Sequence, residues 1–220
     1  MTDPAPNATA QLDYDLRRRW SEVVPLDYRE SALPDVDVNA RATIEAWLRL
    51  VTDDVDDPHV CGPNLVISGP VSCGKTYSGF AAMRTLHFDG TPSCQRWAKG
   101  RPLRRAFGYW SVPVALMRLR SREGGPAFFD ELVDIGVLFL DDIGSVAATD
   151  WTRENLFGLL NERRSRRRPI VTTTNLDQDG LQAHLGELSY TRLVDNAVFV
   201  EMRGRNRRQR RLEVLDGGEQ

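Results

Sequence analysis

The segment Gly69–Thr76 constrains the fold of this chain most, because it reads GPVSCGKT and matches the pattern GxxxxGK[ST] in full. In this pattern the glycines let the main chain wrap closely around phosphate groups, with its N–H groups pointing inward. The apolar run NLVIS precedes the segment and a helix-forming stretch follows it, so the phosphates would also meet the N-terminus of a helix. The pattern therefore predicts a loop that binds the phosphates of ATP.

Two residues of this loop have specific predicted roles. The Lys75 ammonium group would reach the β- and γ-phosphates, and the Thr76 hydroxyl would ligate Mg²⁺. We also assign the other loop residues and the residue that follows them to the nucleotide site: Gly69, Pro70, Val71, Ser72, Cys73, Gly74 and Tyr77.

Polar side chains follow two later apolar strands. Asp141 and Asp142 end the run VLFLDD, where a parallel sheet binds its ligands, and we expect Asp141 to hold Mg²⁺ through its water shell. Asp142 would orient or deprotonate the attacking water. Asn175 closes the next strand and would lie beside the γ-phosphate; the alternative is an asparagine that only starts a turn.

Apolar runs alternate with helical patterns along most of the chain. Because the runs are continuously apolar, they predict a parallel sheet covered by helices on both faces, which is a three-layer α/β fold. The predicted strands are 65–67, 107–112, 136–142, 170–174 and 197–202. The predicted helices are 12–20, 39–51, 75–87, 114–122 and 153–166.

Composition excludes several classes of protein. The chain of 220 residues is 41% hydrophobic and 27% charged, as is ordinary for one globular core. No apolar run approaches the ~20 residues of a membrane span, and the first residues lack a secretory signal pattern. Three cysteines without a CxxC pair argue against a disulfide scaffold, so we expect a cytoplasmic protein.

The basic residues are unevenly distributed. Only Lys75 and Lys99 are lysines among the 29 basic residues, and arginines cluster at 17–19, 163–168 and 203–211. These clusters either offer local patches to phosphate groups or reflect the nucleotide composition of a genome. The histidines share no ligand spacing, and we expect them at the surface or as capping residues: His59, His87 and His184.

The order and spacing of these motifs resemble AAA+ ATPases of the DnaC type, the replicative helicase loaders, and their sister group, the IstB-type transposition ATPases. The resemblance covers roughly residues 20–210 and includes LVDIGVLFLDDIG, the stretch 151–164 and YTRLVDNAVFVEMRGRNRR. It implies a P-loop AAA+ (ASCE) fold with strand order 5-1-4-3-2 and no C-terminal lid domain. Lys75 and Thr76 match the Walker A pair, Asp141 and Asp142 the Walker B pair, and Asn175 the sensor-1 residue.

The resemblance also implies residues and partners that the motifs alone do not. Arg192 matches the arginine finger that reaches the ATP of a neighbouring subunit, so the isolated monomer would hydrolyse ATP weakly. Arg208 is our first choice for the arginine that acts as a sensor-2 equivalent. The implied partners are like subunits, a DnaB-type replicative helicase and single-stranded DNA, with Mg²⁺ and ATP as cofactors.

We expect three parts: a tail, short helix and linker at 1–35, the AAA+ ATPase domain at 36–212, and a C-terminal tail at 213–220. The N-terminal part is shorter than in many helicase loaders, and the basic connection 90–105 has no motif that we can place. Trp20 and Tyr28 either line an adenine pocket or only pack. Phe128 and Phe129, near several arginines, either stack on single-stranded bases or pack under the third strand.

Three alternatives to a helicase loader stay open. An IstB-type helper would assemble on duplex DNA and recruit a transposase. A small-molecule phosphotransferase would use the same loop, although no acceptor site or lid is evident in the sequence. A nucleotide-gated binding module with negligible turnover is also possible, since Asp142 stands where glutamate is commoner.

Overall fold

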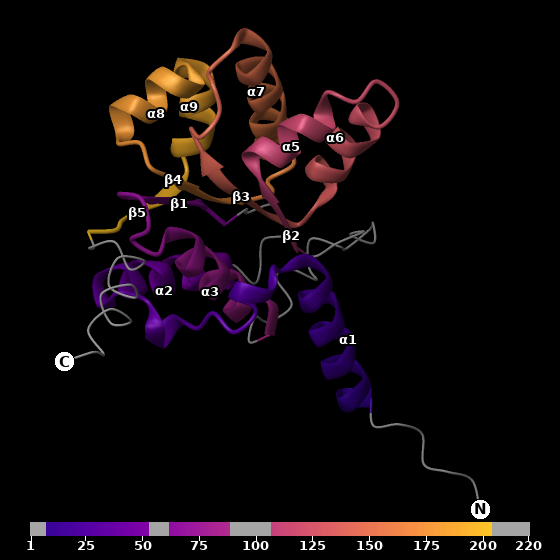
Figure 1. The fold of residues 1–220 in the computed structure, drawn as a ribbon. Helices are drawn as coiled ribbons and strands as arrows, with labels where there is room; N and C mark the ends of the chain where they lie inside the picture. The colour runs from indigo at the N-terminus through magenta and orange to yellow at the C-terminus, as the bar shows by residue number, and fades with distance from the viewer. Residues whose placement is uncertain (1–7, 53–61, 89–106, 204–220) are drawn as a thin grey trace, which may run out of the picture.

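A single sheet of five parallel strands lies at the centre of the computed structural model, which describes residues 8–52, 62–88 and 107–203 (Figure 1). The strands are β1 (Asn64–Ser68), β2 (Phe107–Ser111), β3 (Val137–Ile143), β4 (Ile170–Thr174) and β5 (Ala197–Glu201). Their order is β2-β3-β4-β1-β5. This is the predicted order 5-1-4-3-2 seen from the opposite edge, so the predicted fold is confirmed.

The register of the strands brings their carboxyl ends together. Ser68 of β1 pairs with Thr174 of β4, and Ser111 of β2 pairs with Asp141 of β3. Because all neighbours are parallel, the loops that follow β1, β3 and β4 open at the same edge of the sheet. That edge is where the phosphate loop, the two aspartates and Asn175 lie.

Helices cover both faces of this sheet (Figure 1). On one face lie α2 (Val38–Thr52) and α3 (Lys75–Phe88), together with α1 (Ala8–Val23) and the short 3₁₀ turns η1 (Leu26–Tyr28) and η2 (Leu33–Asp35). The helices on the other face are α5 (Val112–Leu119), α6 (Gly125–Asp134), α7 (Asp150–Ser165), α8 (Gln178–Leu185) and α9 (Glu187–Val194). No helix in the described ranges is long and apolar enough to cross a membrane.

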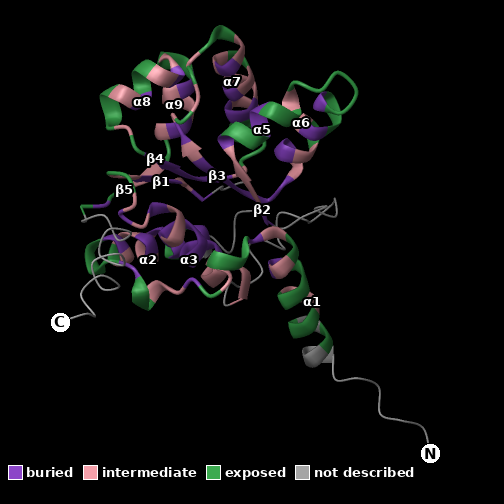
Figure 2. Ribbon diagram, viewed as in Figure 1, coloured by how far each residue is buried: buried purple, intermediate pink, exposed green. Residues whose placement is uncertain are grey.

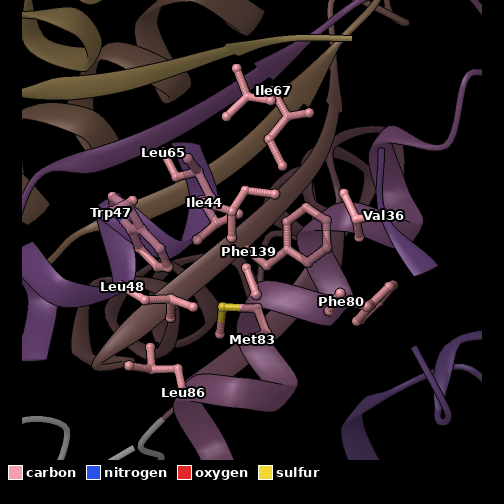
Figure 3. Packing of buried hydrophobic residues seen from close by; sticks show 14 of the residues in the cluster. Val36, Ile44, Trp47, Leu48, Leu65, Ile67, Phe80, Met83, Leu86 and Phe139 are labelled. Carbon is pink, nitrogen blue, oxygen red and sulfur yellow. The ribbon is translucent and has the colours of Figure 1, made fainter. Parts of the chain in front are cut away.

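Side chains along each strand alternate between the two faces of the sheet, so the hydrophobic core has two parts. Leu65 and Ile67 of β1 face α2 and α3, whereas Val66 between them faces the other helical layer. Phe139 of β3 points from the sheet toward Phe80 of α3 (Figure 3), and the centroids of the two rings are 5.0 Å apart. The sheet is therefore buried on both faces, as the continuous apolar runs predict.

Three helices, α6, α8 and α9, were not predicted from the sequence. Each has only eight to ten residues, which is too short for a clear helical period. Their ends are set by local chemistry, since Asp177 caps α8 by accepting a hydrogen bond from the Gly180 N–H, and Gly186 separates α8 from α9 with a φ of 79°. The predicted helix 114–122 begins earlier, at Val112, because Pro113 suits a first helical turn.

The N-terminal helix α1 is largely exposed along its length and enters the core only at its C-terminal end (Figure 2). Trp20 is 4% exposed and packs against Phe88 and Phe107, while Tyr28 stacks on Phe80. The packing alternative therefore describes both aromatic residues. His87, expected at the surface or as a capping residue, is partly buried in the last turn of α3, and its ring stacks on Trp20 with centroids 5.6 Å apart.

Candidate nucleotide-binding site

The phosphate loop adopts a backbone that requires glycine at its start. Gly69 has a φ of 149°, and a Cβ atom there would lie 2.4 Å from the carbonyl oxygen of Met202, which follows β5. Gly74 has a φ of 105° at the point where the loop enters α3. No larger side chain fits at the first position without moving the main chain, so the packing of β5 against the loop explains the Gly69 requirement.

Lys75 points back across this loop. Its Nζ atom donates hydrogen bonds to the carbonyl oxygens of Gly69 at 2.8 Å and Pro70 at 2.7 Å. A third bond goes to Oδ1 of Asn175 at 2.6 Å. Burial lowers the pKa of Lys75, while the nearby Cys73, Asp142 and Asp141 act in the opposite direction. The ammonium group is thus held at the mouth of the loop, beside the end of β4.

Thr76 connects the loop to the predicted metal ligand. Its Oγ1 lies 3.0 Å from Oδ1 and 3.2 Å from Oδ2 of Asp141, although the two residues are 65 positions apart. Hydroxyl and carboxylate oxygens are the hard donors that Mg²⁺ prefers. The two groups therefore form a donor set that suits this ion.

Asp141 is a buried carboxylate, 8% exposed, with further hydroxyl partners. Thr173 Oγ1 donates to Oδ1 at 2.5 Å, and the Tyr109 hydroxyl donates to Oδ2 at 3.4 Å. Burial raises the pKa of Asp141, whereas the hydroxyls of Thr173 and Thr76 oppose that shift. Burial also raises the pKa of Tyr109, so its phenol stays protonated and able to donate.

Thr173 and Tyr109 were not assigned to the site from the sequence. The only sequence signal for Thr173 is a run of threonines next to Asn175 in an otherwise apolar strand. Tyr109 lies in an aromatic strand and has no motif of its own.

Asp142 and Asn175 face each other across the ends of β3 and β4. The Asn175 Nδ2 donates to Asp142 Oδ1 at 3.1 Å, while its Oδ1 accepts from Lys75. Asn175 thereby bridges the cation of the loop and the second aspartate. The alternative of an asparagine that only starts a turn does not account for these two side-chain contacts.

The side chain of Tyr77, in the first turn of α3, contacts the segment before α2. Its hydroxyl donates to Asp35 Oδ2 at 2.8 Å and accepts from the Ala32 N–H at 3.2 Å. The side chain therefore holds residues 32–35 next to the first turn of the phosphate-loop helix.

Arg192 lies on α9, which packs on the face of the sheet opposite to α3, the helix that follows the phosphate loop. It is half-buried, and its Nε donates to Asn161 Oδ1 on α7 at 3.2 Å. None of the contacts found for it in the described part of the chain involves Lys75, Thr76 or Asp141. Arg208 lies outside the described residues.

The arginine run on and after α7 is largely paired within the chain. Arg163 is completely buried, Arg164 pairs with Asp195 at 2.8 Å, and Arg166 and Arg168 both lie 3.0 Å from Asp134. Arg163 is therefore not available to a phosphate group, and the other three guanidinium groups already have an acidic partner within the chain.

Phe128 and Phe129, considered above as a surface for single-stranded bases, pack inside the protein. Phe128 is 3% exposed, and the Arg118 guanidinium lies over its ring, 4.3 Å from the centroid. Phe129 is partly buried and packs against the same core. Packing therefore describes both phenylalanines better than stacking on bases.

The whole fold has clear counterparts among solved structures. The chain is similar to DnaI, with a TM-score of 0.68 and 21% identity over 86% of this chain and 99% of that one. It is similar to the DnaC helicase loader, with a TM-score of 0.64 and 21% identity over 81% of this chain and 100% of that one. The fold is that of an AAA+ ATPase.

The fold is also similar to part of a longer chain, a replication initiator. A DnaA replication initiator bound to AMPPCP and single-stranded DNA has a TM-score of 0.58 and 16% identity, over 85% of this chain and 56% of that one. In sequence, the chain is 27% identical to a protein of Pseudomonas fluorescens assigned as the ATP-binding protein of insertion sequence IS1162. That match covers 70% of this chain and 62% of the relative's length. No protein-family model matches the sequence.

The comparisons thus include both branches of the resemblance found in the sequence, the DnaC-type loaders and an insertion-sequence ATP-binding protein. The resemblance to this group of AAA+ ATPases is confirmed.

Proposed function

We propose that the chain binds and hydrolyses Mg·ATP at the edge of the sheet where β1, β3 and β4 end. The observation that carries this proposal is the pair of networks that meet there, Thr76–Asp141 and Lys75–Asn175–Asp142. Lys75 and the loop amides bind the β- and γ-phosphates, and Thr76 and Asp141 hold the ion. When bound, Mg²⁺ neutralises charge that develops on the phosphate oxygens.

Asp142 and Asn175 act on the attacking water in this proposal. The Asp142 carboxylate accepts the proton or aligns the water, and the Asn175 amide fixes that carboxylate by donating to Oδ1. The same amide contacts Lys75, so one side chain relates the position of the phosphate-binding cation to the position of the base.

Self-association completes the site in this proposal. Arg192 contacts Asn161 on α7 of the same subunit. Among the described residues, none of its contacts is with the phosphate loop. This arrangement is consistent with an arginine finger that acts on the ATP of a neighbouring subunit. An arginine placed on the γ-phosphate in trans raises hydrolysis by ~10³- to 10⁵-fold where such fingers operate. The isolated subunit would therefore turn over ATP slowly. Arg208 would supply a second cation to the same nucleotide.

The proposed role is that of a helicase loader, which delivers a replicative helicase to single-stranded DNA and uses hydrolysis for release. Its support is the match to the DnaC loader and DnaI over essentially their whole chains. The second candidate is a transposition helper that acts on duplex DNA. The insertion-sequence protein among the relatives favours it.

A direct test of the nucleotide site is Lys75→Ala. We expect it to weaken ATP binding by at least about 100-fold, since it removes the one cation inside the loop, as measured by titration calorimetry. Arg41→Ala, which removes a half-buried arginine of α2 that pairs with Glu45, serves as a control and should bind ATP normally. Undiminished affinity in Lys75→Ala would overturn the site assignment.

A second experiment separates the two biological roles. Fluorescence anisotropy with single-stranded and duplex oligonucleotides of equal length, each with and without ATP, reports which DNA is preferred. Purified replicative helicase and purified transposase from the host are then tested for ATP-dependent complex formation. A loader prefers single strands and binds the helicase, whereas duplex preference with transposase binding would favour the second candidate.

A further inference from the structure

The hydroxyls of three consecutive threonines of β4, Thr172, Thr173 and Thr174, form hydrogen bonds to the end of β3; we call these three bonds the threonine clasp. The hydroxyls donate to three acceptors on β3: Thr172 to the Leu140 carbonyl at 2.6 Å, Thr173 to Asp141 Oδ1 at 2.5 Å, and Thr174 to the Ile143 carbonyl at 2.7 Å. All three side chains are at most 1% exposed. A buried hydroxyl without a partner is costly, so the three bonds together specify how β3 ends against β4.

The threonine clasp coincides with a break in the strand ladder. Leu140 pairs with Thr172 and Ile143 pairs with Thr174, so two residues of β3 lie opposite one residue of β4. The two residues are Asp141 and Asp142, and the one is Thr173. This is the arrangement of a β-bulge, which redirects side chains and is common next to active sites.

In this arrangement Asp142 has an uncommon backbone conformation. Its φ is 67°, a left-handed value that few residues other than glycine adopt and that aspartate tolerates better than most. Such a conformation persists only where neighbours hold it. The Thr173 Oγ1 accepts from the Asp142 N–H at 2.9 Å, and the Ser145 hydroxyl donates to the Asp142 carbonyl at 2.8 Å.

One hydroxyl therefore reaches both aspartates. Thr173 Oγ1 donates its proton to the carboxylate of Asp141 and accepts the main-chain proton of Asp142. A hydroxyl can do both at once, whereas valine has the same shape and can do neither.

We propose that Thr173 is a positioning residue for both aspartates, with its single hydroxyl setting the direction of the Asp141 carboxylate and the left-handed turn at Asp142. This inference rests on the proposed function, because it assigns Asp141 to the metal and Asp142 to the water. Thr172 has no such role, since the hydrogen bond found for its hydroxyl among the described residues goes to the Leu140 carbonyl of β3.

The test uses Thr173→Val, with Thr172→Val as the matched control and Thr173→Ser as the conservative rescue. The first readout needs no nucleotide: hydrogen exchange of the Asp142 amide by NMR. Thr173→Val removes the acceptor of that amide, so its exchange should be about tenfold faster or more. Thr172→Val and Thr173→Ser should leave it near the wild-type rate.

The second readout is enzymatic. We expect Thr173→Val to lower kcat by about ten- to a hundredfold, the factor that corresponds to one hydrogen bond to a charged group. At saturating Mg²⁺ the KM for ATP should change by less than about threefold, because the phosphate loop is untouched. The Mg²⁺ concentration for half-maximal nucleotide binding should rise, and serine should restore both values.

The outcomes separate this inference from the proposed function. Unchanged Asp142 exchange in Thr173→Val, or a loss of kcat no larger than in Thr172→Val, overturns the role of Thr173. A wild-type protein that neither binds nor hydrolyses ATP overturns the proposed function, while the exchange measurement still decides whether Thr173 holds Asp142. Melting temperatures of all variants show whether any loss is a folding defect.

Discussion

Asn175 accepts a hydrogen bond from Lys75 at 2.6 Å, although the two residues are 100 positions apart in the chain. The contact exists because β4 lies next to β1 in the sheet, so the end of β4 meets the loop that follows β1. The other end of the Asn175 amide donates to Asp142. The residue that binds phosphate and the residue proposed to act on water are thus joined by one neutral side chain.

Substitution of Asn175 tests whether its contacts with Lys75 and Asp142 matter for hydrolysis. We expect Asn175→Ala to reduce ATP hydrolysis by about 10- to 100-fold, because Asp142 loses the donor that fixes its carboxylate. ATP affinity should change by less than about threefold, since Lys75 keeps its place at the loop. Steady-state kinetics and calorimetry measure the two effects. Asn155→Ala on α7 is the control, and an equal loss in that variant would show a general effect of packing.

The proposed role of Arg192 can be tested with Arg164 as a control, because Arg164 lies on α7, the helix that Arg192 contacts. Arg192→Ala should leave ATP binding intact but abolish the rise in specific ATPase activity with protein concentration, because the finger acts between subunits. Arg164→Ala removes another contact of α7, its ion pair with Asp195, and should retain that rise. If dilute monomeric protein lost as much activity as concentrated protein did, a role in trans would be ruled out.

Arg163 is predicted to be a stability residue. Its guanidinium donates to five carbonyl oxygens around the end of α6 and the starts of β3 and β4, those of Leu132, Val133, Ile135, Gly136 and Pro169. Arg163→Met keeps the length but leaves these acceptors without a donor, at a cost of about 2–4 kcal/mol in the free energy of unfolding. Urea denaturation measures this cost.

The control for this experiment is Arg166→Met, which removes only half-exposed ion pairs. Pairs of that kind contribute about 0–1 kcal/mol. An equal loss of stability in the two variants would contradict the structural role of Arg163.

His87 predicts a loss of stability in acid. Burial between aromatic rings lowers the pKa of His87 below its ordinary value of 6.5, an effect that Arg19 reinforces and the bond to the Leu16 carbonyl opposes. The unfolded chain therefore binds this proton more readily than the folded chain does. The contribution of His87 to stability is present above pH 6.5 and is lost as the pH falls from 6.5 through the folded-state pKa.

Melting temperatures between pH 8 and pH 5 measure this dependence. His87→Phe keeps an aromatic ring against Trp20 but cannot titrate, so its melting temperature should fall less steeply in acid. The pKa of His184 is also lowered by burial, and His184→Gln measures its separate share. The same slope in wild type and His87→Phe would show that His87 does not carry the effect.

Much of the site was predictable because its parts are local. The residues from Gly69 to Thr76 are adjacent, and the aspartates and Asn175 each end an apolar run, so short windows of sequence reveal them. The role of Thr173 could not be predicted from the sequence, because it depends on which residues of β3 lie opposite Thr173. That is decided by a register shift of one residue, which no pattern within β4 encodes.

The same distinction applies to the charged residues. The sequence shows six positions at 163–168 that contain five arginines, but it does not show that Arg163 points inward to carbonyl groups while Arg164, Arg166 and Arg168 meet aspartates from other elements. Short helices such as α8 were missed for a related reason. Their stability comes from caps and from packing on α7 and α9 rather than from a long amphipathic pattern.

The sequence by itself determined the phosphate loop, the alternation of buried strands with helices and the identity of the polar residues at strand ends, because each depends on neighbouring positions and their periodicity. Only the tertiary structure decided which of those residues touch. Contacts such as Lys75–Asn175 and Thr76–Asp141 arise from the strand order and register of the whole sheet, and these are set by the packing of both helical layers at once.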